Sequence, residues 1–189
     1  MRSLVFALLI LASVAVLFRE ELAIAQAPGR SSTSAPRATV RVQANLAQVM
    51  RGILLPTSNV VFFAQSNNPA DVKAAADPSA ATDPLASTYG GWTAVENSSL
   101  ALSEAARLLT VPGRVCSNGR PVPVMNADWV KFVQGLRQAG ITAFKAAQTK
   151  NQDKMLDAAD AVTTACADCH NVYREKTPEQ GGLASRCTK

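Results

Sequence analysis

Apolar residues recur every three or four positions in four stretches of the chain, and no stretch alternates apolar and polar residues as a strand does. The first stretch runs from residue 42 to residue 63 and contains Pro56, which we expect to kink or interrupt a helix. Its repeated apolar positions are Val42, Leu46, Val49, Ile53, Val60 and Phe63. The pattern predicts an amphipathic helix that buries these side chains.

The other three stretches have the same spacing and recognisable boundaries. In the second, Thr93 and Glu96 are spaced as a capping box, and the Pro-Gly pair at 112–113 ends the pattern. The third starts at Asn126, a good N-cap residue, and the fourth follows Asn151. The repeated apolar positions of the second stretch are Trp92, Val95, Leu102, Ala106 and Leu109. Those of the third are Trp129, Val133, Leu136, Gly140, Ala143 and Ala147, and those of the fourth are Met155, Ala159, Val162, Cys166, Cys169 and Tyr173.

Four amphipathic helices in one chain predict an all-α fold, an antiparallel up-down-up-down four-helix bundle. The connections at 66–91 and 111–125 are long, and the first of them is rich in Ala, Asp, Pro and Ser. In this topology the second helix ends, the third begins and the fourth ends at the same end of the bundle.

The fourth stretch ends with the sequence Cys-Ala-Asp-Cys-His at 166–170, which is the attachment signature of a c-type haem. One helical turn separates Cys166 from Cys169, so both thiols can add to the vinyl groups along one porphyrin edge. The imidazole of His170 can then ligate the iron. Because His170 is the only histidine, a haem with two histidine ligands is excluded. Both cysteines fall on the apolar stripe, which places the predicted haem in the core.

Three other interpretations of the CxxC pair have to be weighed. A thioredoxin-like redox pair belongs to a βαβ context, which this chain does not predict. A zinc site needs further cysteine or histidine ligands, and Cys116 and Cys187 stand alone in the sequence. A chance pair is the third alternative. The complete CxxCH motif favours haem attachment.

The first 25 residues have the composition of an export signal. Arg2 precedes a nearly unbroken apolar run at 4–18, and a small-residue pattern favours cleavage after Ala25. The run is shorter than the roughly 20 residues of a transmembrane helix, but the charged residues at 19–21 are untypical of a signal peptide, so an uncleaved anchor is the alternative. We expect a periplasmic protein with a signal peptide at 1–25, a flexible leader at 26–38, a helical domain at 39–177 and a tail at 178–189.

The net charge of +5 is unchanged when the first 25 residues are removed, because their two arginines cancel their two glutamates. A mild basic excess suits steering towards an acidic redox partner protein. It does not indicate nucleic-acid binding, because no Lys/Arg run with interleaved aromatic residues is present.

Two of the four cysteines, Cys116 and Cys187, are not part of the motif. The bundle topology places both at the same end, and an exported protein meets an oxidising compartment. We therefore expect a Cys116–Cys187 disulfide, with two free thiols as the alternative.

The second axial ligand of the iron follows from the same topology. The first helix begins near residue 40, at the end of the bundle where the fourth helix finishes. A helix rises about 1.5 Å per residue, so we expect Met50 and His170 at similar distances from that end, in neighbouring layers of the bundle. The thioether of Met50 could thus reach the distal face of the haem, and methionine raises the reduction potential. Ordinary core filling is the alternative role of Met50. Met125 lies in a loop and is a weaker candidate, and Met155 is too far along the fourth helix.

These features resemble the class II c-type cytochromes, the cytochrome c-prime family, and more closely its low-spin, six-coordinate members. The motif lies near the C-terminus and continues to Tyr173 and Arg174, which resembles the aromatic and basic residues of the family's extended motif. The resemblance implies that Met50 takes the position of the distal methionine; high-spin members have an apolar residue there and a five-coordinate iron. It covers roughly residues 40–177, and the chain departs from the family at 66–91, at 111–125 and in the tail to Cys187.

We therefore expect an electron carrier rather than an enzyme, with one covalent haem c whose iron is held by His170 and Met50. The alternative is a five-coordinate haem protein that binds nitric oxide or carbon monoxide, which requires that Met50 not ligate. Peroxide catalysis would need an acid–base group such as a distal histidine, which the chain lacks.

The two residues after the motif have open roles. Arg174 could pair with a haem propionate or be a solvated cation near a helix end. Tyr173 could pack against the porphyrin or complete the apolar seam. Redox proteins are the expected partners, a homodimer is possible as in the resembling family, and membrane attachment requires an uncleaved N-terminal segment.

Overall fold

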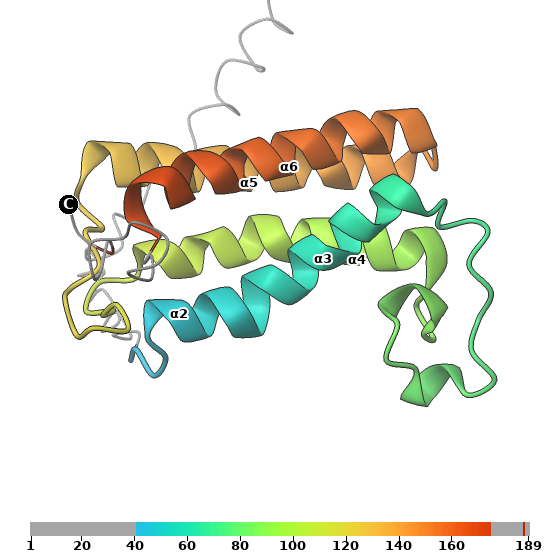
Figure 1. The fold of residues 1–189 in the computed structure, drawn as a ribbon, viewed down its shortest axis with the longest axis horizontal. Helices are drawn as coiled ribbons and strands as arrows, with labels where there is room; N and C mark the ends of the chain where they lie inside the picture. Colours follow the sequence, from blue (N-terminus) through green and yellow to red (C-terminus); the bar gives the residue numbers. More distant parts are fainter. Residues whose placement is uncertain (1–40, 175–186, 188–189) are drawn as a thin grey trace, which may run out of the picture. The chain divides into compact units, whose positions relative to one another are not determined.

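The computed structural model describes residues 41–174 and Cys187, and four helical stretches dominate it (Figure 1). The first stretch consists of α2 (Leu46–Val49), a π-helix (Met50–Leu54) and α3 (Leu55–Ser66); the second of α4 (Gly91–Ala105) and a 3₁₀-helix (Ala106–Thr110); the third is α5 (Ala127–Gln148) and the fourth α6 (Gln152–Tyr173). The expected signal peptide, leader and tail lie outside the described residues, Cys187 excepted.

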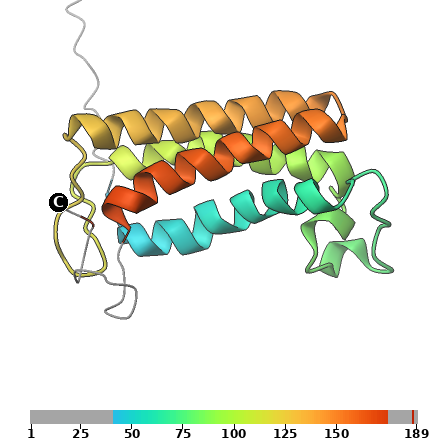
Figure 2. The same ribbon diagram turned by 45° about the horizontal axis from the view of Figure 1, so that its top comes forward.

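Consecutive helices are neighbours in the bundle. Helix α3 packs against α4, α4 against α5 and α5 against α6, and α3 also packs against α6, so that the four enclose one core (Figure 2). The predicted all-α, antiparallel four-helix bundle is confirmed. All apolar positions predicted for the second and third stretches are buried; those of the fourth are buried except Cys166 and Cys169, which are half-buried.

The first helical stretch continues through Pro56 instead of breaking there. Proline has no amide hydrogen, and its ring clashes with the carbonyl four residues earlier in an α-helix. The chain avoids this clash by widening the preceding turn: Met50–Leu54 is π-helical, and the amide of Leu55 donates to the carbonyl of Met50. The hydroxyl of Thr57 donates to two carbonyls of the widened turn, at 2.8 and 3.0 Å. These hydrogen bonds give the carbonyls of Ile53 and Leu54 a side-chain donor beside the proline.

The widened turn also changes which side chains are buried. Ile53 and Phe63 were expected in the core, but they are 39% and 46% exposed, so this prediction is wrong. A π-turn adds one residue to the helical repeat. The buried stripe therefore passes from Val49 to Leu54, five residues on. Among the described residues, Leu46–Ser66 is long and apolar enough to cross a membrane, a composition that core helices of soluble bundles share.

Helix α4 begins earlier than the sequence pattern predicts. Its N-cap is Gly90 and its first residue is Gly91, so the expected capping box of Thr93 and Glu96 is wrong. The cause is a close approach of two backbone segments, because a Cβ atom at Gly90 would lie 2.2 Å from the carbonyl oxygen of Leu85. Glycine is required at position 90, and the helix that it caps begins at Gly91, two residues before Thr93.

The other two predicted N-caps are at the expected positions. The side chain of Asn151 accepts a hydrogen bond from the amide of Lys154 at 2.9 Å, as capping requires. Asn126 is the N-cap of α5 but makes no such bond; its amide group donates to the hydroxyl of Tyr173 at 3.4 Å. The capping residue of α5 thus contacts the last turn of α6.

The two long connections lie at opposite ends of the bundle (Figure 1). The 66–91 connection contains two 3₁₀ turns, Pro78–Ala80 and Pro84–Ala86. The 111–125 connection lies at the end where α6 finishes and contains Cys116, which forms the predicted disulfide with Cys187. The two Cα atoms are 5.7 Å apart, and both residues are buried. The expected disulfide is therefore confirmed, and the alternative of two free thiols is wrong.

Gly140 lies where α5 crosses close to α4, so its substitution tests that crossing. A Cβ atom at Gly140 would lie 2.8 Å from the backbone nitrogen of Ser103, which cannot move without shifting α4. We expect Gly140→Ala to lower the free energy of unfolding by about 1–3 kcal/mol in chemical denaturation. Gly135→Ala is the control, because that position is open; we expect a gain of at most about 1 kcal/mol from helix propensity. Equal effects of the two substitutions would contradict the crossing.

Candidate functional site

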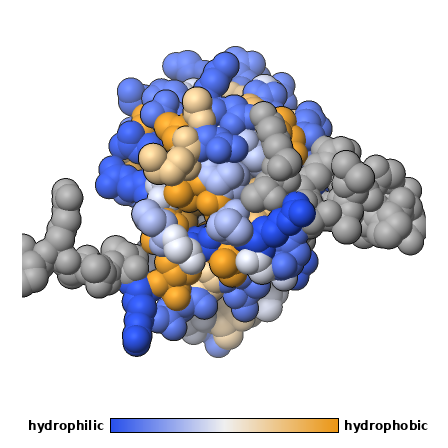
Figure 3. Space-filling view, turned by 90° about the vertical axis from the view of Figure 1, so that its left-hand side faces the viewer, coloured by the Kyte–Doolittle hydropathy of each residue, from blue (hydrophilic) through white to orange (hydrophobic). Residues whose placement is uncertain are grey.

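A cavity of about 660 Å³ lies between the helices at the end of the bundle where α6 finishes. All four helical stretches contribute to its mostly apolar wall, including Leu46, Leu54, Leu102, Leu109, Val133 and Leu136. Figure 3 looks onto this end and shows apolar side chains around a central hollow, with hydrophilic side chains around them. Cofactor pockets typically measure about 300–1,000 Å³, so this cavity has the size of a cofactor site.

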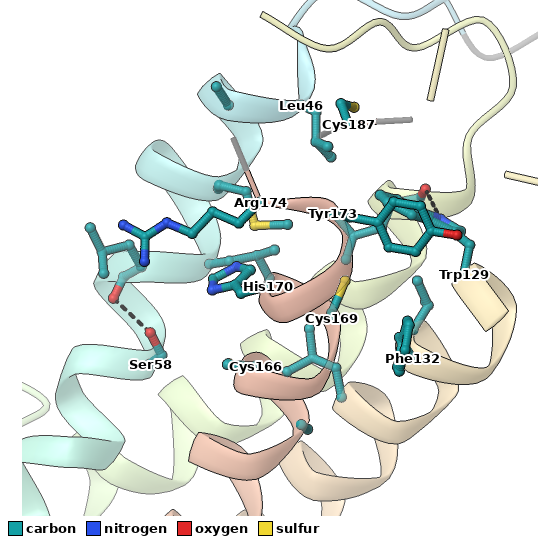
Figure 4. Close-up of a pocket in the computed structure, with 18 of the residues that line it drawn as sticks. Leu46, Ser58, Trp129, Phe132, Cys166, Cys169, His170, Tyr173, Arg174 and Cys187 are labelled. Atoms are coloured by element: carbon teal, nitrogen blue, oxygen red, sulfur yellow. Dashed lines mark hydrogen bonds between the residues drawn. The ribbon is translucent and has the colours of Figure 1, made fainter. Parts of the chain in front are cut away.

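The last two turns of α6 supply the reactive side chains of the wall. Cys166, Cys169 and His170 all line the cavity, because positions three and four apart share one face of a helix. In Figure 4 the His170 ring points from α6 towards the α2–α3 stretch. The two thiols and the imidazole thus share the wall of a single, mostly apolar cavity.

Burial determines the protonation of these groups. It raises the pKa of the Cys166 thiol and raises the pKa of Cys169 to about 11, to which the charges of Cys166 and Asp128 contribute further. Burial, and then the positive charge of Arg174, lowers the pKa of His170. At neutral pH the thiols are therefore protonated and the imidazole is neutral. A redox-active CxxC pair has the opposite property, a lowered thiol pKa, so that alternative loses support.

Met50 lies on the cavity wall, at the first residue of the π-helix. It is half-buried and packs against the core. The other two methionines in the described part of the chain do not line the cavity: Met125 is 89% exposed in its loop, and Met155 is fully buried in the bundle core. Of these three sulfurs, only that of Met50 is therefore placed on the same cavity as His170.

Tyr173 completes the apolar seam, which is one of its two expected roles, and it also lines the cavity. Its ring meets those of Trp129 and Phe132 edge-on, with centroids 5.0 and 6.2 Å apart. Its hydroxyl donates to Asp128 Oδ1 at 2.7 Å. The last turn of α6 is thus held against the first turn of α5, which keeps the neighbouring His170 in place. The sequence pattern contains no signal for Asp128.

Two cations line the cavity, Arg51 and Arg174, and none of the described residues in its wall is acidic. Both are exposed, and in Figure 4 the Arg174 side chain extends from the end of α6 over His170. Arg51 was not predicted as a site residue. The signal that could have identified it is its isolation, because it is the only charged residue between positions 46 and 66.

The disulfide is part of the same site. Cys187 lines the cavity, so the Cys116–Cys187 bond attaches a wall residue to the 111–125 connection. Sequence reasoning predicted the bond but not its place on the cavity.

Among the described residues, no group of three or more His, Cys, Asp and Glu side chains is arranged to hold a metal ion. The described residues of the wall thus surround a mostly apolar space and do not form a closed ligand set for a bare ion. No family model matches the sequence, and no curated protein or solved structure matches it either. The function is therefore inferred from the cavity and the residues on its wall.

Proposed function

We propose that this protein is a periplasmic c-type cytochrome, resembling the class II type, that carries single electrons through one covalently attached haem c. The observation that carries the proposal is that Cys166, Cys169 and His170 line one apolar cavity of cofactor size. The fit is chemical as well as spatial. Apolar walls suit a porphyrin, protonated thiols can add to vinyl groups, and a neutral imidazole is the form that ligates iron.

Different residues of the cavity wall would hold different parts of the haem. Each thiol, of Cys166 and of Cys169, would add across one vinyl group, its hydrogen and its sulfur taking the two carbons. His170 would ligate the iron from α6, and Met50 would ligate it from the π-helix. When bound, the haem supplies one-electron exchange between ferric and ferrous iron.

Two features of the cavity favour electron transfer over catalysis. With protein ligands from His170 and Met50, no position on the iron is left for a substrate. The described residues of the wall also include no carboxylate, and no second histidine exists to move a proton. The chain therefore keeps both ligands and its apolar wall unchanged while the electron passes, which keeps reorganisation small.

Arg51 and Arg174 would hold the propionates of the haem. A guanidinium pairs with a carboxylate through two parallel hydrogen bonds, and these are the two cations among the described residues of the cavity wall. Both are exposed, so they would hold the propionates where solvent reaches them. The net charge of +5 still favours an acidic redox partner.

Intact mass spectrometry of protein exported by a bacterium that makes c-type cytochromes tests the proposal. We expect a mass increase of one haem, and a Soret band that remains with the protein after denaturation. Cys166→Ala/Cys169→Ala should lose both, because no thioether can form. Cys116→Ala/Cys187→Ala is the matched control and should keep both. Wild-type protein without bound haem would refute the proposed function.

A further inference from the structure

We propose that Arg114, which lies outside the cavity, is a positioning residue that keeps Met50 in place as an iron ligand. The inference depends on the proposed function, because it concerns how the chain holds one of the two ligands. Its physical basis is a buried cation that connects the 111–125 connection to the start of the first helical stretch.

Arg114 is 6% exposed, which is rare for an arginine. Its Nε donates to the carbonyl of Leu108 at 3.0 Å, and its Nη1 donates to the carbonyl of Ala44. Among the described residues it forms no salt bridge, and burial lowers its pKa. A buried guanidinium without a carboxylate partner is costly, so both carbonyls must stay in place to stabilise it. The side chain thereby joins the end of the α4 stretch to the residue before the N-cap of α2.

Val115, the residue after Arg114, attaches the same end of α2. The amide of Leu46, the first residue of α2, donates to the carbonyl of Val115 at 2.8 Å. The N-cap Asn45 forms a capping box with Gln48, which is a bond within α2 itself and does not place it in the bundle. Arg114 and Val115 are thus adjacent residues that together place the start of α2.

This attachment matters because α2 is short. It contains four residues before the π-helix begins at Met50, and the wider turns of Met50–Leu54 separate it from α3. α2 is the terminal turn of the continuous helical stretch that ends at Ser66, and terminal turns fray where nothing holds them. The position of α2, and of the Met50 side chain that follows it, therefore depends on tertiary contacts at this end as well as on the helix that continues from it. Besides the apolar contacts of Leu46 and Val49, the polar contacts that supply it are those of Arg114 and Val115.

The test compares Arg114→Met with Arg107→Met in the haem-loaded protein. Methionine keeps the apolar stem of Arg114 but removes both donors, whereas Arg107 lies nearby with 66% of its side chain exposed. We expect Arg114→Met to raise the high-spin fraction of the ferric protein and to increase the affinity of the ferrous protein for carbon monoxide about tenfold, the factor that corresponds to the lost hydrogen bond to Ala44, which is the one of the two that attaches the start of α2. Arg107→Met should change neither quantity.

A double-mutant cycle with Met50→Ala separates positioning from general stability. If Arg114 acts through Met50, adding Arg114→Met to Met50→Ala leaves the spin state and the carbon monoxide affinity unchanged. Should Arg114→Met fail to fold, Arg114→Lys, which keeps the charge and loses the planar geometry, is measured in the same way and should show an intermediate shift.

Two results would overturn the inference while leaving the proposed function intact. In the first, Arg114→Met lowers only the free energy of unfolding, and the spectrum and the carbon monoxide affinity stay as in the wild type. In the second, the protein binds haem but Met50→Ala changes neither quantity, so that Met50 is not a ligand to be positioned. Absence of haem from the wild type would instead refute the proposed function.

Discussion

Replacing Met50 with alanine is expected to convert the iron of the haem-loaded protein from low spin to high spin. Met50 is the only methionine of the described residues that lines the cavity, and alanine offers no atom that can ligate. The serine hydroxyl on the same wall, that of Ser58, already donates to the carbonyl of Leu55 at 3.1 Å and is a poor iron ligand. The second axial position would therefore become vacant, and the ferrous protein should bind carbon monoxide readily.

Optical spectra of both oxidation states, recorded with and without carbon monoxide, measure this change. Met125→Ala is the control, because Met125 is 89% exposed and outside the cavity wall, and its spectra should match those of the wild type. Wild-type protein that is already high-spin, with spectra unchanged by Met50→Ala, would instead favour the five-coordinate alternative, a binder of nitric oxide or carbon monoxide. The covalent attachment through α6 would stand in either case.

The helices were predictable because their apolar periodicity is long and regular. The stripes of α4, α5 and α6 have five or six apolar positions each and contain no proline, so a constant helical repeat assigns their buried faces correctly. The first stretch failed at Ile53 and Phe63 for a single reason. Pro56 is absorbed by a π-turn, and the added residue rotates the buried face for the rest of the helix. A helix can accommodate the same proline by a kink or by a widened turn, and the apolar pattern of the sequence does not distinguish the two.

The site was predictable only where one element or the topology determines it. The thiols and the imidazole share a face of one helix, so spacing alone places them together. Met50 followed from the order of the helices. Arg51, Asp128 and Arg114 were missed because their roles depend on which residues of distant segments meet: Asp128 meets Tyr173, and Arg114 meets Ala44, 70 residues earlier.

Removing the Cys116–Cys187 disulfide is expected to cost more stability than any other change considered. The bond closes a loop over a sequence separation of 71 residues, and the chain-entropy model assigns about 4 kcal/mol to a loop of that length. That is a large part of the roughly 5–15 kcal/mol by which a domain is stable. The proposed thioethers of Cys166 and Cys169 would not contribute to this loss, because thiols do not reduce thioethers.

Guanidinium unfolding of Cys116→Ala/Cys187→Ala against the wild type measures the effect. Reduction of the wild type with a thiol reagent should lower its free energy of unfolding to that of the double variant, since both chains then lack the same covalent closure. The proposed axial ligands, Met50 and His170, lie on the first helical stretch and on α6, so the folded double variant should keep the wild-type optical spectrum. A stability loss below about 1 kcal/mol would mean that the reduced chain already holds the two ends together, through buried contacts such as those of Tyr173 with Trp129. In that case Cys187 would contribute to the cavity wall and not to the stability of the bundle.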